Sequence, residues 1–185
     1  MNKPSHFNFK TSVAIAAMLL ASVAHAQTGD KAVYKSSKDR IAAEYKADKA
    51  ACDSKAGNAK DICMEEAKAK DKVALAELEY AYTGKPADAN KIPVTKAETA
   101  YAVAKEKCDD LAGNAKDVCV KEAKAVEVKA LADAKTNKKV VEARMDGAQE
   151  KRDADYKVAA EKCEAMAGDA KASCIATAKS RFGKS

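Results

Sequence analysis

The sequence has no tryptophan, two histidines and three prolines among its 185 residues, and aromatic residues make up only 5%. Both histidines, His6 and His25, lie before Gln27. The rest of the chain therefore has no Ser–His or Cys–His nucleophile pair and no histidine general base. It also has no C-x-x-C motif and no Gly-rich phosphate-binding loop. We expect no catalytic residue and no enzyme.

Large apolar side chains are also scarce. After Gln27, Leu, Ile, Val and Phe together number 20, a level so low that it is often found in disordered chains. Most other positions are held by Ala, Lys, Glu and Asp, and the first three are strong helix formers. We therefore expect thin helices with shallow, alanine-lined contacts that need a covalent link to hold them together.

The segment over 1–26 has the pattern of a signal peptide. Lys3 and Lys10 precede an apolar stretch over 13–24 (VAIAAMLLASVA), which is too short to span a bilayer. The small-x-small motif at 24–26 predicts cleavage before Gln27, with an uncleaved anchor as the alternative. Cleavage lowers the formal charge from +6 to +4 and leaves an exported, periplasmic or secreted chain with no membrane span.

One sequence unit occurs three times. The copies are YKADKAACDSKAGNAKDICMEEAKA over 45–69, YAVAKEKCDDLAGNAKDVCVKEAKA over 101–125 and YKVAAEKCEAMAGDAKASCIATAKS over 156–180. Each copy begins with a tyrosine, namely Tyr45, Tyr101 or Tyr156, and its first cysteine follows seven residues later. The nearly equal spacing of these three tyrosines is typical of a repeated supersecondary unit.

The centre of each copy predicts a helix–turn–helix. A glycine stands where the first helix would end in a left-handed residue, and Asn or Asp follows as an N-cap for the second helix. These turn residues are Gly57 and Asn58, Gly113 and Asn114, and Gly168 and Asp169. Asp61 and Asp117 resemble the acidic partner of a capping box, whereas the third copy has Ala172 there, so we expect its hairpin to be the weakest.

The two cysteines of each copy fall at matching heights on the two helices. The first lies five residues before the glycine and the second six after it, so both stand roughly 8–9 Å from the turn. The predicted disulfides are Cys52–Cys63, Cys108–Cys119 and Cys163–Cys174. Closing each loop is worth on the order of 3 kcal/mol, and an even number of cysteines in an exported chain favours oxidation.

Metal binding is the competing interpretation of the cysteines. Zinc and iron–sulfur sites use closely spaced ligands, often with His, whereas ten residues separate the cysteines here. Cu(I) held by thiolates, with Met64 or Met166 assisting, is chemically feasible. The spacing and the compartment favour disulfides, so we expect no metal site and no cofactor.

The three repeat tyrosines lie on the same helical stripe as the first cysteines. Tyr101 and Cys108, for example, share a three-to-four spacing with Ala97 and Leu111. A tyrosine that stacks on a ligand is one interpretation. Helical spacing favours the other, in which each tyrosine belongs to the repeat core beside its disulfide.

These features predict an all-α fold of three antiparallel helical hairpins with a period of about 55 residues, each stapled by a disulfide, after a cleaved signal peptide. The expected parts are a signal peptide over 1–26, hairpin one over 27–83, a Pro/Gly linker over 84–93, hairpin two over 94–137 and hairpin three over 138–185. The sequence around 136–139 is compatible with either a short turn or a bend in a long helix. Packing of the hairpins into one bundle is left open.

Two stretches, EEAKAKDKVALAELE and KEAKAVEVKALADAK, resemble the helical middle segment of TolA-type cell-envelope proteins. That resemblance implies a non-catalytic structural or interaction protein of the envelope. The chain departs from this family in its cleavable signal, its paired-cysteine repeat and its lack of a globular C-terminal domain. Basic periplasmic chaperones with long helical arms are a second likeness, which implies a chaperone-like, stress-protection role.

The charge pattern limits the kinds of partner that we expect the protein to bind. The 34 basic and 28 acidic residues are mixed along the helices and are not interleaved with aromatic residues, which argues against nucleic acid. Carboxylates alternate with lysines, as at Glu66 and Lys70, which is typical of solvated helices. We expect an exported, non-catalytic envelope protein, with a chaperone-like or metal-binding module as the alternative. Envelope proteins, envelope polymers and self-association all stay open as partners.

Overall fold

A computed structural model describes residues 29–184, and within that range the chain is helical with no strand. The helices are α1 (Lys31–Cys52), α2 (Asn58–Thr83), α3 (Pro86–Cys108), α4 (Gly113–Glu164) and α5 (Gly168–Phe182). The all-helical class predicted from the sequence is confirmed. The predicted signal peptide over 1–26 lies outside the described residues.

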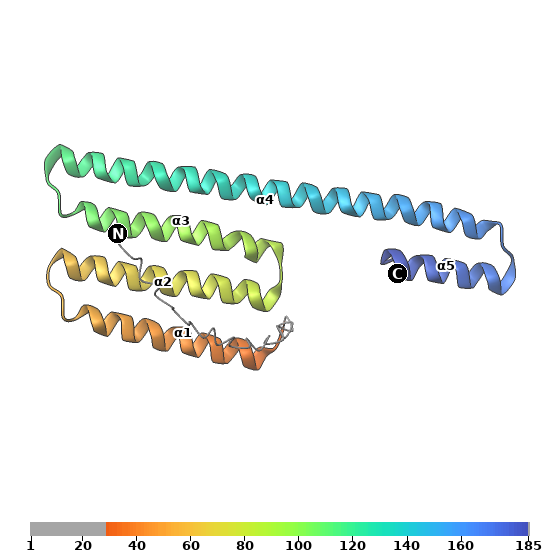
Figure 1. The fold of residues 1–185 in the computed structure, drawn as a ribbon, viewed down its shortest axis with the longest axis horizontal. Helices are drawn as coiled ribbons and strands as arrows, with labels where there is room; N and C mark the ends of the chain where they lie inside the picture. Colours follow the sequence, from red (N-terminus) through yellow and green to blue (C-terminus); the bar gives the residue numbers. More distant parts are fainter. Residues whose placement is uncertain (1–28, 185) are drawn as a thin grey trace, which may run out of the picture.

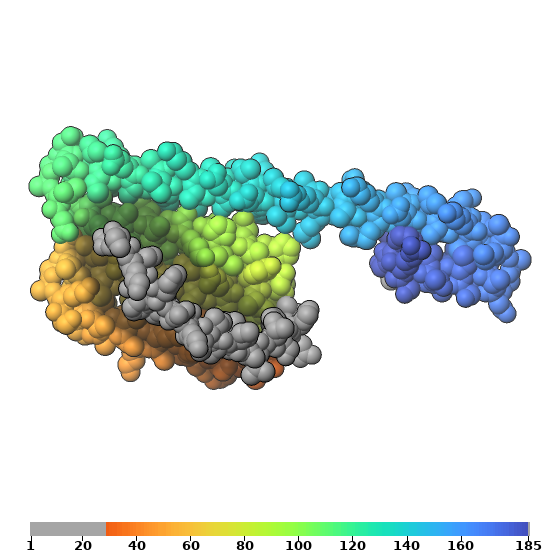
Figure 2. Space-filling view, in the orientation of Figure 1, coloured from red at the N-terminus to blue at the C-terminus, as the bar shows by residue number. Residues whose placement is uncertain are grey.

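The helices form a layer that is one helix thick, with an arm projecting from it (Figure 1). α1, α2, α3 and the first part of α4 lie side by side and antiparallel, and each helix contacts only its neighbours in sequence. α4 has 52 residues and α3 has 23, which gives lengths of about 78 Å and about 35 Å. α4 therefore runs far past the layer, and α5 folds back along its end (Figure 2).

The predicted linker over 84–93 is wrong, because α3 already begins at Pro86. Gly84 adopts a left-handed conformation (φ 63°) and ends α2, and its N–H donates to the Tyr80 carbonyl at 2.8 Å. Pro86 follows as the first residue of α3, where its missing N–H leaves no intrahelical bond unmade. Pro93 lies inside α3, so the two helices are joined by only Gly84 and Lys85.

The predicted boundary at 137–138 falls inside α4, which continues unbroken through 136–139. This stretch has no Gly or Pro to stop a helix, unlike the join between α2 and α3. Copies two and three therefore share one helix. The first two hairpins are united in the layer, and the third, formed by α4 and α5, makes up the arm (Figure 1).

The core consists of small side chains. The buried apolar residues of the described range are Ile41, Cys52, Ala67, Ala97, Cys108, Ala134, Cys163 and Ala178. The first cysteine of each pair is at most 1% exposed, and these three are the largest side chains buried to that extent. The expected apolar stripe of copy two stops at its cysteine, because Leu111 lies past the end of α3 and is 44% exposed.

Polar contacts supplement this thin core between neighbouring helices. The Tyr34 hydroxyl of α1 donates to Glu79 of α2 at 2.9 Å, and this hydrogen bond raises the pKa of Tyr34. The Tyr34 ring lies 4.5 Å from that of Tyr82, also on α2. An ion pair between Asp48 and Lys70 (2.8 Å) joins the same two helices nearer the turn. Contacts of this kind fix the register of helices that share little apolar area.

Asp88 secures the sharp join between α2 and α3. It is buried in the first turn of α3, where the Thr83 hydroxyl donates to its carboxylate at 2.6 Å and the Lys91 ammonium lies 2.8 Å away. The hydrogen bonds from Lys91 and Thr83 hold the pKa of Asp88 below its usual value of 3.8. The charged carboxylate is therefore the form that the folded chain favours.

This environment predicts a pH-dependent effect of Asp88→Asn. A lowered folded pKa means that the carboxylate stabilises the fold above its unfolded pKa, and that this contribution is lost as the pH falls through the folded value. The variant should have a lower urea midpoint than the wild type at pH 7, and the difference should shrink below about pH 4. Asp110→Asn, in the exposed loop after α3, should show neither effect. An unchanged difference from pH 7 to pH 2.5 would contradict this assignment.

Candidate functional site

The three hairpin tips share one construction, and its central element is the disulfide. The predicted pairs Cys52–Cys63, Cys108–Cys119 and Cys163–Cys174 are the pairs in the structure, with Cα–Cα distances of 5.6, 5.7 and 5.7 Å. Each joins the last turn of one helix to the first turns of the next. No cysteine of the described range is free.

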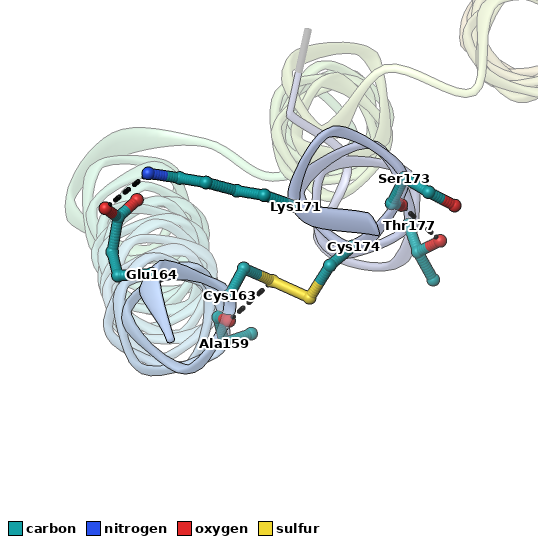
Figure 3. The surroundings of a disulfide bond; sticks show 7 residues. All are labelled: Ala159, Cys163, Glu164, Lys171, Ser173, Cys174 and Thr177. Atoms are coloured by element: carbon teal, nitrogen blue, oxygen red, sulfur yellow. Dashed lines mark hydrogen bonds and ion pairs between the residues drawn. A yellow bond between two sulfur atoms is a disulfide. The ribbon is translucent and has the colours of Figure 1, made fainter. Parts of the chain in front are cut away.

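An ion pair spans each tip beside the disulfide. The pairs are Lys60–Asp53 at 3.0 Å, Lys116–Asp109 at 3.0 Å and Lys171–Glu164 at 2.7 Å. Figure 3 shows the third, where the ion pair and the disulfide both cross from α4 to α5. Our sequence analysis missed these pairs. The signal was present, because an acid follows the first cysteine directly and a lysine follows it by eight residues in every copy.

The turn differs from the one predicted. Gly57, Gly113 and Gly168 all have φ 55°, but they lie at the start of the second helix and not at the end of the first. The helix starts have no side-chain cap, so Asn58, Asn114 and Asp169 are not N-caps. At the first tip, Gly57 occupies the cap position itself and Asn58 is already helical. Its side-chain amide instead donates to the Glu106 carbonyl of α3 at 3.0 Å.

The acidic residues expected to complete a capping box also fall short of that role. Asp61 does lie in the first turn of α2, where a negative charge suits the positive end of the helix dipole. Asp117 lies beyond the first turn of α4, whose first turn has no acidic residue. Without an Asn side chain at the cap position, the reciprocal pair of hydrogen bonds cannot form.

The repeat tyrosines are half-buried, which lies between the exposed, ligand-stacking ring and the core ring that were the two interpretations of the sequence. Tyr45, Tyr101 and Tyr156 each lie against their hairpin without entering the fully buried core. The Lys49 ammonium lies 5.3 Å from the centre of the Tyr45 ring, and that of Lys124 lies 4.8 Å from the Tyr101 ring. Cation–π contacts of this kind stabilise a partly solvated ring face. Two of the three rings therefore already have an intramolecular partner.

A trough of about 430 Å³ opens where α4 passes the end of the layer. We call it the α2–α4 trough, and its lining comes from the end of α2, the start of α3 and the middle of α4. Its lining includes Tyr80, Pro86, Pro93, Asn137 and Val141. Tyr80 and Val141 are 40% and 44% exposed, so apolar surface reaches solvent there. The two prolines have no backbone N–H to donate and add to its apolar lining.

The described residues show few other features that would support metal binding or membrane insertion. No three His, Cys, Asp or Glu side chains within 29–184 gather in a way that could hold a metal ion. The Cu(I) alternative needs thiolates, whereas the sulfur atoms here are joined in pairs. None of the helices in this range combines the length and the apolar character needed to cross a lipid bilayer.

Comparison with protein-family models, with curated proteins and with solved structures finds no match for this chain.

The third disulfide should matter most for local structure. α5 contacts only α4 and has 15 residues, a length at which an isolated helix is marginal in water. Replacing Cys163 and Cys174 by Ser removes on the order of 3 kcal/mol from this hairpin. Amide hydrogen exchange should then show loss of protection across 168–182, with protection across 31–108 unchanged.

The matched control replaces Cys52 and Cys63 by Ser. α2 packs on α3 as well as on α1, so its amides should stay protected in this variant. Full protection of 168–182 after loss of the third disulfide would contradict the role given to the staple.

The turn geometry gives a second prediction at the tips. Gly57 has φ 55° and ψ −147°, a combination open essentially only to glycine. A Cβ there would meet no atom within 4 Å, so the cost of Gly57→Ala is one of backbone conformation alone. We expect a loss of about 1–3 kcal/mol in the free energy of unfolding, measured by urea titration. Lys55→Ala, an exposed change in the same loop, is the control. Equal stability of the two variants would be inconsistent with the left-handed turn.

Proposed function

We propose that the protein is a non-catalytic interaction protein of an exported compartment, with its helical layer serving as a scaffold on which another envelope component docks. The three disulfides are consistent with an oxidising location. The predicted signal peptide over 1–26 supports the same compartment. The mixed charges of the helices support a soluble scaffold more than a catalytic cleft, because the two buried carboxylates of the described range, Asp88 and Glu127, are each paired with a lysine on their own helix.

The observation that carries this proposal is the single layer. Because each helix contacts only its sequence neighbours, no other helix of residues 29–184 covers either face of the layer or the arm (Figure 1). An enzyme of this size would bury a large part of its surface around one concave site. The described chain instead spreads its residues into an extended surface, which suits protein–protein contact more than small-molecule chemistry.

The α2–α4 trough is the surface that we assign to this contact. Its apolar lining next to charged rims matches the pattern of an apolar centre and polar rim that interfaces share. An aromatic side chain, Tyr80, lies in it beside Pro93 and Val141. Residues of this kind account for a large share of binding energy when a partner covers them.

A site-specific photocrosslinking experiment in the native compartment tests the proposal. A photoreactive residue at Tyr80 probes the trough, and one at Val33, which is 58% exposed on α1, is the matched control. We expect one discrete crosslinked product from the probe at 80, absent from the probe at 33. The product should weaken when Val141→Lys places a charge in the trough. Equal products from both probes, or none from either, would overturn the assignment of the trough.

A chaperone-like function is the second candidate, and the exposed side chains of the arm favour it. Val141 and Met145 are 44% and 51% exposed and lie one helical turn apart on α4. Methionine adapts to varied apolar partners. This function predicts that stoichiometric protein suppresses the aggregation of an unfolded outer-membrane protein, and that Met145→Lys with Val141→Lys abolishes the suppression. A scaffold without this activity leaves the aggregation unchanged.

A further inference from the structure

The exposed side of α4 repeats the interface between α2 and α3, position by position. In that interface, Lys107 of α3 forms an ion pair with Glu66 of α2 at 2.8 Å. Lys96 forms another with Glu77 at 2.7 Å. These contacts join the second helix of copy one to the first helix of copy two. The equivalent contacts one repeat further along the chain would join the second helix of copy two to the first helix of copy three. Those two segments are the two halves of α4.

The equivalent positions on α4 carry the same charges as the interface between α2 and α3. Aligning copy two with copy one, Tyr101 on Tyr45, places the two acids of α2 at Glu122 and Asp133, on the first half of α4. Aligning copy three with copy two places the two lysines of α3 at Lys162 and Lys151, on the second half. All four side chains are exposed, and none of them forms an ion pair within the described chain. One helix thus carries both halves of a complementary set.

Exposed valines stand among these charges. Val126 and Val158 are 65% and 57% exposed, and they hold the positions of two residues that line the groove between α2 and α3. Val118 and Val140 are 44% and 41% exposed. At 3.6 residues per turn, all four fall on the side of α4 that carries the four charges. We call this set of eight residues the α4 stripe. These valines place apolar side chains beside the four charges, where a helix packed along the stripe would cover them.

The two halves of the stripe cannot meet within one chain. Between copies one and two, the chain reverses at Gly84 and Pro86, and this reversal brings α2 and α3 together. The same alignment of copy two with copy one places Val140 and Glu142 at the equivalent positions. Neither residue stops a helix, so α4 runs straight on and separates its own complementary halves.

We propose that two copies of this chain pair through the α4 stripe, with the two α4 helices antiparallel and a two-fold axis near residues 140–142. The first half of each helix then lies against the second half of the other. Glu122 of one copy meets Lys162 of the second, and Asp133 meets Lys151. Each contact occurs twice, as a two-fold axis requires, and the assembly closes at two copies. The exchange is a domain swap in which the missing turn is replaced by a second chain.

The surroundings of α4 leave room for this partner. α3 and α5 both lie along one side of α4, and the upper edge of α4 in Figures 1 and 2 has no other described helix against it. Two residues of the stripe, Val158 and Lys162, also line the open groove between α4 and α5. α3 packs against the corresponding side of α2. The second copy would therefore extend the layer by the same helix-on-helix contact that already holds α2 to α3.

Sedimentation equilibrium of the oxidised, signal-cleaved protein tests the pairing. We expect a monomer–dimer equilibrium in the wild type. Lys151→Glu with Lys162→Glu should raise the dissociation constant on the order of tenfold or more, because four ion pairs become four like-charge contacts. Lys135→Glu with Lys157→Glu makes the same change in net charge at exposed positions off the stripe, and it should leave the equilibrium unchanged.

A charge exchange makes the test specific. Adding Glu122→Lys and Asp133→Lys to the stripe double variant restores opposite charges across the axis, and it should restore the dimer. Circular dichroism confirms that each variant is folded. The proposal is overturned by a wild type that stays monomeric up to about 100 μM, by assemblies larger than two copies, by equal weakening in the control double variant, or by failure of the exchange to restore pairing.

Discussion

The disulfide across each hairpin tip is the constraint on which the rest of the structure depends. The helices are rich in alanine and charge, and few large side chains lie between them, so hydrophobic burial alone holds each pair weakly. The first cysteine of each pair is nearly fully buried, and these three are the largest side chains buried to that extent in the described range. The covalent bond limits the conformations of the unfolded chain, and the ion pair and the left-handed glycine beside it set the direction in which the chain reverses. A chain stapled in this way can spread into a single layer where an unstapled one would need a compact bundle.

The sequence predicted those features that depend on local spacing. The three disulfide pairs followed from eleven-residue spacing about a glycine, and the helical class followed from composition. The predicted linker failed because Pro86 was read as a breaker, although proline is well suited to the first position of a helix. The predicted Asn and Asp caps failed because each second helix begins earlier than expected: Gly57 is the cap residue of α2, and Gly113 and Gly168 are already the first residues of α4 and α5. Both errors concern where a helix begins, because several local patterns compete at a helix end.

The packing of the hairpins could not be predicted from periodicity, because it depends on which sides of neighbouring helices meet. Ion pairs such as Lys96–Glu77 join residues from different copies, and only the fold brings them together. The trough containing Tyr80 and Val141 likewise arises where the middle of α4 passes the join between α2 and α3, which lies about fifty residues earlier in the sequence. The repeat nevertheless contains information about these contacts. Once the α2–α3 interface is known, the alignment of the copies identifies its unfilled counterpart on α4. In a repeat protein, one observed interface therefore predicts where another can form.

The central claim is that three intrahairpin disulfides hold the chain in this form. Non-reducing peptide mapping by mass spectrometry tests it most directly, on protein taken from its own compartment after free thiols have been alkylated. The account predicts linked peptides for Cys52–Cys63, Cys108–Cys119 and Cys163–Cys174, with no alkylated cysteine. Free thiols, or pairs that join different hairpins, would contradict it.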